Sequence, residues 1–302
     1  MIDLVYRMLI PLGCSKLGYA WNHFLLKTGA YLYPLLCRFR PLAEKDKLSQ
    51  KDDVIISLTS FPGRINRVEV CVQSLLRQRQ KPDRIILWLA LDEFPDRKIP
   101  SGLQSLTQYG LEIRFCCEDL KPHKKWYYTA REYRNSIIIT VDDDIIYSPR
   151  LVERLLDAHR KNTDTVLCCN AHRIKLDHNG EIAPYDNWDA GARDFQGPSH
   201  YLLAVGAGGV LYPPRTFDDT FFDISAIRAT SLFTDDLWLK FNEIRRGIRV
   251  KKIIARSTQL VSIPGSQKVA LKNINTGKKG KNDESIEYLQ QMFSLNWNEL
   301  ID

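Results

Sequence analysis

The sequence predicts an α/β fold in which a mostly parallel sheet is flanked by helices and preceded by an amphipathic helical arm. Two observations carry this prediction. Short runs of branched apolar residues, typical of buried parallel strands, occur at 54–57, 84–90, 111–116 and from 136 onward. Helical segments alternate with these runs, and this β-α-β-α-β order is typical of a parallel sheet covered on both faces.

The composition fits one large α/β domain or a domain with appendages. The 302 residues are 44% hydrophobic and 26% charged, and the formal charge of +7 favours an anionic partner such as a nucleotide sugar or a lipid surface. A nucleic-acid binder is disfavoured, because the basic residues form no dense stripe with interleaved aromatics. The seven cysteines show no Cys-x-x-Cys spacing, so we expect buried, reduced thiols in a cytosolic protein.

Residues 1–42 differ from the rest of the chain, because they are rich in Leu, Tyr, Trp and Phe and carry almost only basic charges. Their uncharged runs are shorter than the ~20 apolar residues that cross a bilayer, and the segment lacks a clean signal-peptide cleavage site. The favoured interpretation is one or two interfacial helices on an anionic membrane, at the inner face of the cytoplasmic membrane. The alternative is an arm packed on the globular domain or on a partner subunit. Residues 43–53 form a polar linker by composition.

The first half of the domain, residues 54–150, is expected to alternate strands and helices. Turn residues follow the strand at 54–57, and a helix is predicted at about 67–80. Pro82 ends that helix before the strand at 84–90. A loop, a short helix and the strand at 111–116 follow, and a helix at 124–133 then leads to the run that begins at 136.

Three consecutive carboxylates, Asp142, Asp143 and Asp144, follow this last run. Open α/β sheets bind ligands just beyond the carboxyl ends of their strands. Side-chain alternation would place Asp142 and Asp144 on one side and Asp143 on the other. A hard divalent cation that carries a phosphate would offset their mutual repulsion. The alternative is a charged turn before a helix that begins near Pro149.

The next part, residues 151–260, is expected to begin with a helix at 151–161 and a strand at 165–169. A long aromatic loop at about 175–199 follows, and such loops are more often functional than idle. The stretch 205–214 places three glycines before an apolar strand, which suits close approach of a ligand to the backbone or a glycine bulge.

A helix is predicted at 234–247, with Asp235 and Asp236 at its start and Gly247 at its end. Aspartates at this position are common purely as helix caps, which is the alternative to a functional role. A strand at 248–255 follows, and residues 261–302 hold a basic turn at 277–281 and an amphipathic helix to about 293.

Residues 54–255 resemble a bacterial glycosyltransferase of the Rossmann-like GT-A fold, akin to glycosyltransferase family 2. The three aspartates match the family's Asp-x-Asp, which implies that Asp142 and Asp144 hold a metal and that Asp142 meets the nucleotide diphosphate. The segment from 235 to 250 resembles the family's acidic helix that ends in Arg-Gly-x-x-Val. There Asp236 takes the place of the catalytic base, and Asp235 replaces a glutamate.

The resemblance also implies binding residues for the donor. Lys124 and Lys125 resemble the basic position that precedes the aspartate motif in many members. Asp92 is the nearest match to the aspartate that binds the nucleotide base, and Arg64 is a further candidate cation near the phosphates. The chain departs from many GT-A enzymes in lacking a C-terminal histidine as a metal ligand, since none follows His200.

The implied enzyme is a hexosyl-transferring glycosyltransferase with a nucleotide-diphospho-sugar donor, a UDP-sugar foremost. A divalent metal, Mn²⁺ or Mg²⁺, would offset the charge that develops on the leaving diphosphate. Asp236 would accept the proton of the acceptor hydroxyl from the opposite face, with inversion at the anomeric carbon. Gly206, Gly208, Gly209 and Trp188 would shape the acceptor side, with an ordinary core position as the alternative for Trp188.

The basic, aromatic arm suggests a glycan or lipid-linked acceptor, as in bacterial surface polysaccharide or lipopolysaccharide assembly. One rival is a sugar-nucleotide pyrophosphorylase, which normally carries a Gly-rich loop after the first strand, where this chain has only Gly63. The other is a non-catalytic membrane-surface scaffold that retains the fold. The intact acidic motifs argue against this second rival.

Overall fold

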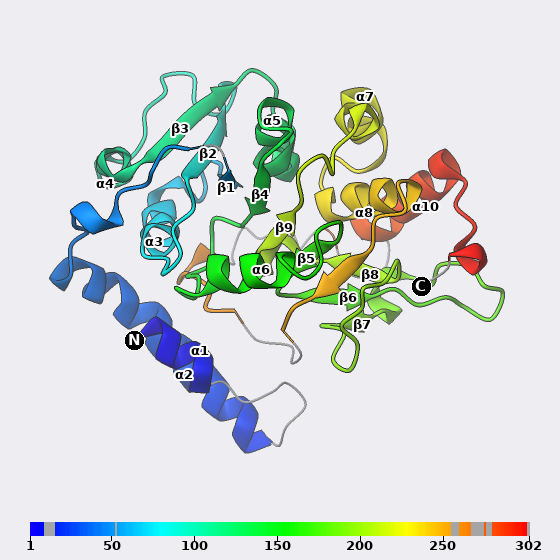
Figure 1. Cartoon of the computed structure of the whole chain (residues 1–302), viewed down its shortest axis with the longest axis horizontal. Helices are drawn as coiled ribbons and strands as arrows, with labels where there is room; N and C mark the ends of the chain where they lie inside the picture. Colours follow the sequence, from blue (N-terminus) through cyan, green and yellow to red (C-terminus); the bar gives the residue numbers. More distant parts are fainter. Residues whose placement is uncertain (9–15, 52, 255–259, 267–274, 276–279, 301–302) are drawn as a thin grey trace.

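The computed structural model describes residues 1–8, 16–51, 53–254, 260–266, 275 and 280–300. Within these residues a seven-stranded sheet has the order β10-β5-β9-β4-β1-β2-β3 (Figure 1). Its strands are β1 (Val54–Thr59), β2 (Arg84–Ala90), β3 (Leu111–Cys116), β4 (Ile137–Thr140), β5 (Val166–Cys168), β9 (Val210–Tyr212) and β10 (Val250–Lys252). The predicted α/β class with a mostly parallel sheet is confirmed.

One strand runs against the others. β9 lies between β4 and β5 and pairs with both in antiparallel register, whereas β1, β2, β3 and β4 are parallel neighbours. The glycine-rich segment before β9 therefore enters the sheet at the edge where β4 ends. This arrangement places residues 206–209 beside the aspartates that follow β4.

Helices cover both faces of the sheet, as the buried side chains show. Ile56 and Leu58 of β1 pack in one core cluster with α3 (Ile65–Leu76), α6 (Leu151–His159) and α4 (Ser101–Ser105). Ile55 and Ile86 point the other way, toward α5 (Lys124–Glu132). Alternation along a strand explains this division. Helices α7 (Ile224–Thr230), α8 (Asp235–Arg245) and α10 (Lys281–Phe293) gather at one end of the domain (Figure 1).

The predicted long loop is more ordered than expected. It contributes β7 (Asp189–Ala190) to a small antiparallel sheet with β6 (Ala171–Arg173) and β8 (Leu202–Ala204). Other predicted elements shift at their ends, as fraying helix termini commonly do. The helix expected at 67–80 spans Ile65–Leu76, and the strand expected at 248–255 spans Val250–Lys252. Of the predicted basic turn at 277–281, residues 277–279 lie outside the described residues.

The described cysteines agree with the expected buried thiols, apart from Cys117. Burial raises the pKa of Cys71 and Cys168 well above the usual thiol value, so these groups stay protonated. The free cysteines that the structure describes are Cys37, Cys71, Cys116, Cys168 and Cys169, which are buried, and Cys117, which is exposed.

The arm consists of α1 (Ile2–Met8) and α2 (Lys16–Phe39), which lie side by side along one flank of the domain (Figure 1). Gly29 of α2 permits their contact, because a Cβ there would lie 3.2 Å from Val5 Cγ2. One side of α2 joins the main core through residues such as Leu25 and Tyr33. Among the described residues, no helix combines the length and apolar character needed to cross a membrane.

Tyr6 fastens the arm to the domain. Its hydroxyl donates a hydrogen bond to the Ile146 carbonyl (2.8 Å) and accepts one from the Val261 N–H (3.2 Å). Replacing Tyr6 by phenylalanine should lower the free energy of unfolding by roughly 1–3 kcal/mol, because two buried backbone groups lose this partner. Chemical denaturation would measure this loss, with Tyr19→Phe at an exposed position of α2 as the control. Equal stability of the two variants would contradict a fastening role for Tyr6.

Candidate active site

The aspartate run lies where the chain leaves the sheet. β4 ends at Thr140, and Asp143 and Asp144 occupy a turn. The predicted alternation, with Asp142 and Asp144 on one side and Asp143 on the other, is therefore wrong, because it holds only within a strand. Arg64 instead holds Asp143 and Asp144 together, with Nη1–Oδ1 and Nη2–Oδ2 distances of 2.7 Å and 3.1 Å.

Asp143 has a second side-chain partner in addition to Arg64. Ser60 Oγ donates a hydrogen bond of 2.6 Å to its second oxygen, and the carboxylate is buried. Burial raises the pKa of Asp143, and Arg64 and Ser60 oppose the rise. Ser60 and Arg64 come from the loop between β1 and α3, so Asp143 ties the first and fourth strands of the chain together at this edge.

Tyr147 links the aspartate turn to the glycine segment. Its hydroxyl accepts a hydrogen bond from the Asp142 N–H (2.8 Å) and lies 3.0 Å from the Ala207 carbonyl, to which it donates. The carbonyl of Asp144 accepts a further bond from the Ile263 N–H (2.7 Å). The Tyr147 hydroxyl and the Ile263 N–H therefore hold the backbone of the acidic turn, independently of its carboxylates.

A second cation, Lys125 of α5, joins the two predicted acidic motifs. Its Nζ lies 2.8 Å from Asp142 Oδ1 and 3.0 Å from Asp235 Oδ2. Asp236 completes this group, since its charge also acts on Lys125. We call Lys125, Asp142, Asp235 and Asp236 the lysine–carboxylate cluster. The structure thus brings together residues that are separated by more than 90 positions along the chain.

Gly206 lies directly against the lysine–carboxylate cluster. A Cβ at this position would lie 2.7 Å from Lys125 Nζ, 3.2 Å from Asp236 Oδ1 and 3.5 Å from Asp142 Oδ1. The Gly206 N–H donates to Asp236 Oδ2 at 3.3 Å. Only a residue without a side chain allows the three charged groups to converge here, which explains the glycine.

The cluster carries three carboxylates and one ammonium, and the pKa values respond to this balance. Burial, followed by the charge of Asp235, raises the pKa of Asp236 to about 8, while Lys125 opposes the rise. Burial alone would lower the pKa of Lys125, but Asp142, Asp235 and Asp236 raise it well above its usual value. Asp236 is consequently poised to exchange a proton near neutral pH.

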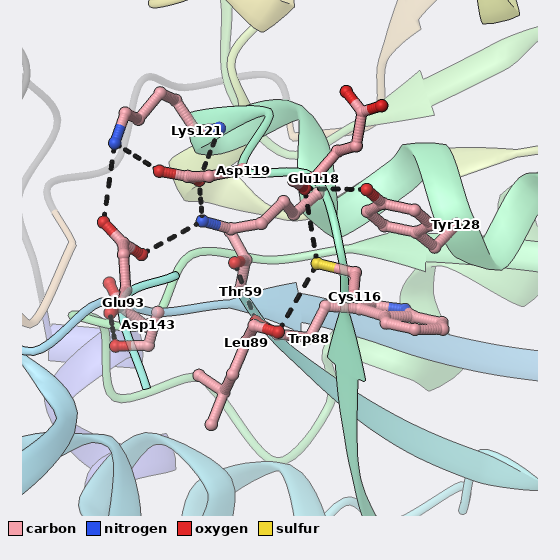
Figure 2. A network of polar contacts seen from close by, with 12 residues as sticks. Thr59, Trp88, Leu89, Glu93, Cys116, Glu118, Asp119, Lys121, Tyr128 and Asp143 are labelled. Carbon is pink, nitrogen blue, oxygen red and sulfur yellow. Dashed lines mark hydrogen bonds and ion pairs between the residues drawn. The ribbon is translucent and has the colours of Figure 1, made fainter. Parts of the chain in front are cut away.

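Lys124 lies apart from this cluster, although it was predicted to act beside Lys125. Its buried side chain pairs with Asp119 and with Glu93, the latter at 3.3 Å. Lys121 contacts the same two acids, and Figure 2 shows this network around the ends of β2 and β3. Asp92, the predicted base-binding residue, is exposed in the turn that precedes Glu93.

The other predicted acceptor-side residues pack within the domain. A Cβ at Gly208 would lie 2.9 Å from Asn170 Cβ, and Gly209, with φ +89°, would meet Leu151 at 2.9 Å. Both glycines therefore serve close packing, which leaves Gly206 as the one whose Cβ would meet the cluster. Trp188 is buried and donates its indole N–H to the Ala183 carbonyl (2.8 Å).

Tyr185 is a further site residue, which was noted in the sequence only as one aromatic of a long loop. Burial raises the pKa of its hydroxyl, and the negative charge of Asp236 adds to the rise. The ring lies against Trp188, with centroids 4.9 Å apart. Its backbone N–H donates a hydrogen bond to Asp283 Oδ1 (2.8 Å), which ties the loop to the start of α10. Tyr147 was missed as well, because nothing in the sequence distinguishes it from other buried tyrosines.

The residues present fit a divalent metal only in part. Asp142 and Asp144 supply hard oxygen donors, and 31% of the Asp142 side chain is exposed. Among the described residues, no group of three or more His, Cys, Asp or Glu side chains converges as a metal site. Magnesium sites of one or two carboxylates completed by substrate phosphates are common, and these donors suit that kind of site.

A comparison with protein families agrees with the fold. Residues 63–201 match the family described as Glycosyl transferase family 2. A search of curated proteins finds no match.

One similar solved structure is CMP:2-keto-3-deoxy-manno-octonic acid synthetase complexed with CTP, at 13% sequence identity and a TM-score of 0.43. The match covers 83% of this chain and 100% of that chain. Another is 4-diphosphocytidyl-2C-methyl-D-erythritol synthase from Anaerococcus prevotii, at 14% sequence identity and a TM-score of 0.40. That match covers 68% of this chain and 86% of the other.

Proposed function

Because residues 63–201 match the family described as Glycosyl transferase family 2, we propose that the chain transfers a sugar from a nucleotide-diphospho-sugar, a UDP-sugar foremost, to an acceptor hydroxyl with inversion. The observation that carries this proposal is the lysine–carboxylate cluster. It joins a donor-side acid, Asp142, to an acid with a raised pKa, Asp236, across one shared cation. A transferase needs these two functions side by side, because the leaving group and the attacking hydroxyl meet at the same carbon.

On the donor side, Asp142 and Asp144 would hold a divalent metal, which supplies electrostatic stabilisation of the departing diphosphate. Arg64 already lies beside Asp143 and Asp144 and adds a fixed positive charge at this edge of the sheet. Lys125 contributes a second one beside Asp142. Preorganised charges of this kind cost little reorganisation when the leaving group becomes negative.

On the acceptor side, Asp236 would take the proton from the attacking hydroxyl. The Gly206 N–H donates to Oδ2 and orients the carboxylate. Because its pKa is raised to about 8, Asp236 in its deprotonated form is a stronger base than an ordinary carboxylate. Asp235 then acts through Lys125, with which it pairs, and we assign it a positioning role.

We propose a glycan or a lipid-linked molecule as the acceptor, as expected for surface polysaccharide or lipopolysaccharide assembly. The apolar, basic arm supports this choice. A nucleotidyltransferase remains the second candidate, and the single glycine between β1 and Arg64 counts against it. A non-catalytic scaffold would have no use for three carboxylates gathered on one buried lysine, since their repulsion destabilises the fold.

The donor assignment predicts metal-dependent thermal protection by one nucleotide sugar from a panel of UDP-, GDP- and dTDP-sugars. At saturating donor the melting temperature should rise by roughly 5 °C with Mn²⁺ or Mg²⁺ present, accompanied by slow donor hydrolysis. Asp144→Asn should abolish the metal-dependent part of this shift. Asp157→Asn, at an exposed position of α6, should retain it. Protection by none of the sugars would refute the donor assignment.

A further inference from the structure

The N-terminal helix α2 carries an exposed apolar stripe along most of its length. Its members recur at steps of three, four or seven residues, so they share one side of the helix. The apolar stripe comprises Leu17, Trp21, Phe24, Tyr31, Leu35 and Phe39. A different side of α2, with Leu25, Tyr33 and Cys37, is already buried against the domain. An exposed patch of this extent marks an interaction surface rather than a packing remnant.

The charges beside the stripe are of one sign. α2 contains no acidic residue. Lys27 and Arg38 are exposed and lie eleven residues apart, which is close to three helical turns, so both side chains leave the helix on the same line. Arg40 follows at the end of the helix and is also exposed. The one acid of α1, Asp3, already pairs with Arg7 and Arg79.

We propose that the apolar stripe docks α2 in the plane of an anionic lipid bilayer, with Lys27 and Arg38 at the level of the lipid phosphates. Aromatic side chains make up much of the stripe, and Trp and Tyr favour the interface between headgroups and hydrocarbon. An amphipathic helix with aromatic and leucine residues on one face and cations beside it binds such surfaces. The 24 residues of α2 lie along the membrane and do not cross it.

A second copy of the chain fits this surface less well. Two stripes packed together would bring the cations of both helices near each other, and α2 offers no carboxylate to pair with them. Self-association through helices normally relies on opposite charges beside the apolar seam. An anionic bilayer supplies the missing negative charge, so charge complementarity selects the lipid surface.

Docking of α2 would also position the catalytic domain. Tyr6 of the arm bonds to the Ile146 carbonyl, two residues beyond Asp144, and to the Val261 N–H. Gly29 and Val5 hold α1 against α2. The apolar stripe therefore belongs to the same packed body as the acidic turn, and the bilayer would lie at a fixed orientation to the site.

The tryptophans of the chain provide a direct probe for this proposal. Trp21 lies in the stripe and is 40% exposed, whereas the other five tryptophans are buried. These are Trp88, Trp126, Trp188, Trp238 and Trp297. On vesicles of phosphatidylcholine and phosphatidylglycerol in equal parts, the full chain should show a blue shift of its fluorescence and quenching by brominated lipid. Trp21→Phe should remove both signals, and no nucleotide sugar is needed, so the result is independent of the proposed activity.

Charge-neutralising variants then test whether the apolar stripe binds an anionic bilayer. The double variant K27Q/R38Q should bind the anionic vesicles roughly 30-fold more weakly, whereas K98Q/K161Q, at two exposed positions of the catalytic domain, should bind like the wild type. Absence of vesicle binding, or equal binding to pure phosphatidylcholine with no effect of K27Q/R38Q, would overturn the proposal. A lipid-free dimer that F24S/L35S converts to a monomer would also overturn it, in favour of a second copy.

Discussion

Asparagine in place of Asp236 is expected to lower the rate of sugar transfer by roughly 10²–10⁴-fold while leaving donor-induced thermal protection intact. The reason is that the amide keeps the size and the hydrogen-bond acceptor for the Gly206 N–H but cannot take a proton from the acceptor hydroxyl. Transfer to acceptor and thermal shift with donor, measured on the same preparation, separate the two functions. If the variant transfers sugar at the wild-type rate, Asp236 is not the base.

The same substitution should raise stability at alkaline pH, which distinguishes lost chemistry from misfolding. The folded-state pKa of Asp236, about 8, lies above its ordinary value of 3.8. The stabilisation that Asp236 provides is therefore complete below pH 3.8, its ordinary pKa, and is lost as pH rises through about 8. D236N has no such loss, so it should unfold at a higher temperature than the wild type at about pH 9. Asp219→Asn, at an exposed position, serves as the control.

The pH profile of the wild type follows from the same pKa. Since the base must be deprotonated, kcat/KM should rise with pH through about 8 in the free enzyme. The residual transfer of D236N should lack this rise. A wild-type profile that falls over this range would contradict the assignment of Asp236 as base and would point to a group that acts in its protonated form.

Much of the fold could be predicted because its central strands are uniformly apolar. Ile55, Ile56, Ile85 and Ile86 lie in runs long enough for a strand, too short for a helix, and bounded by turn residues. The direction of β9 could not be predicted, because its short run of three residues carries no information about its neighbours. The direction of β9 depends on the placement of β4 and β5 on either side of it, which is a property of the tertiary structure.

The site shows where local patterns fail. Lys124 and Lys125 are adjacent in sequence, but neighbours on a helix point about 100° apart, so one meets Asp119 and the other meets Asp142. Alternation failed for Asp143 because the strand ends two residues before Asp142. Trp188 looked available as a sugar platform from its loop position, yet its indole is buried against Ala183. In each case the residue type was informative, but the sequence did not show where the side chain points.

Methionine in place of Lys125 should have the largest effect on stability, a loss of roughly 3–5 kcal/mol near pH 8, because it leaves Asp142, Asp235 and Asp236 without their shared cation. The Lys125 ammonium stays charged through the neutral range, because its pKa is raised. Its contribution to the free energy of unfolding is therefore constant below pH 10.5, the ordinary pKa of lysine. Asp236 provides the pH dependence, because its pKa is raised to about 8. As Asp236 binds a proton below that pH, the repulsion within the cluster decreases, and the variant should come closer to the wild type.

Two further variants show whether this loss belongs to the cluster. K125M/D235N removes one carboxylate with the cation and should recover part of the stability, so the two substitutions should be non-additive. K240M removes another buried lysine, which pairs with Glu243 at 3.4 Å within α8. It should destabilise the fold but preserve donor protection. If K125M were as stable as the wild type from about pH 5 to pH 9, the two acidic motifs would not be electrostatically coupled. The donor and acceptor sides would then act as separate sites, and the raised pKa of Asp236 would need a cause other than its neighbours in the cluster.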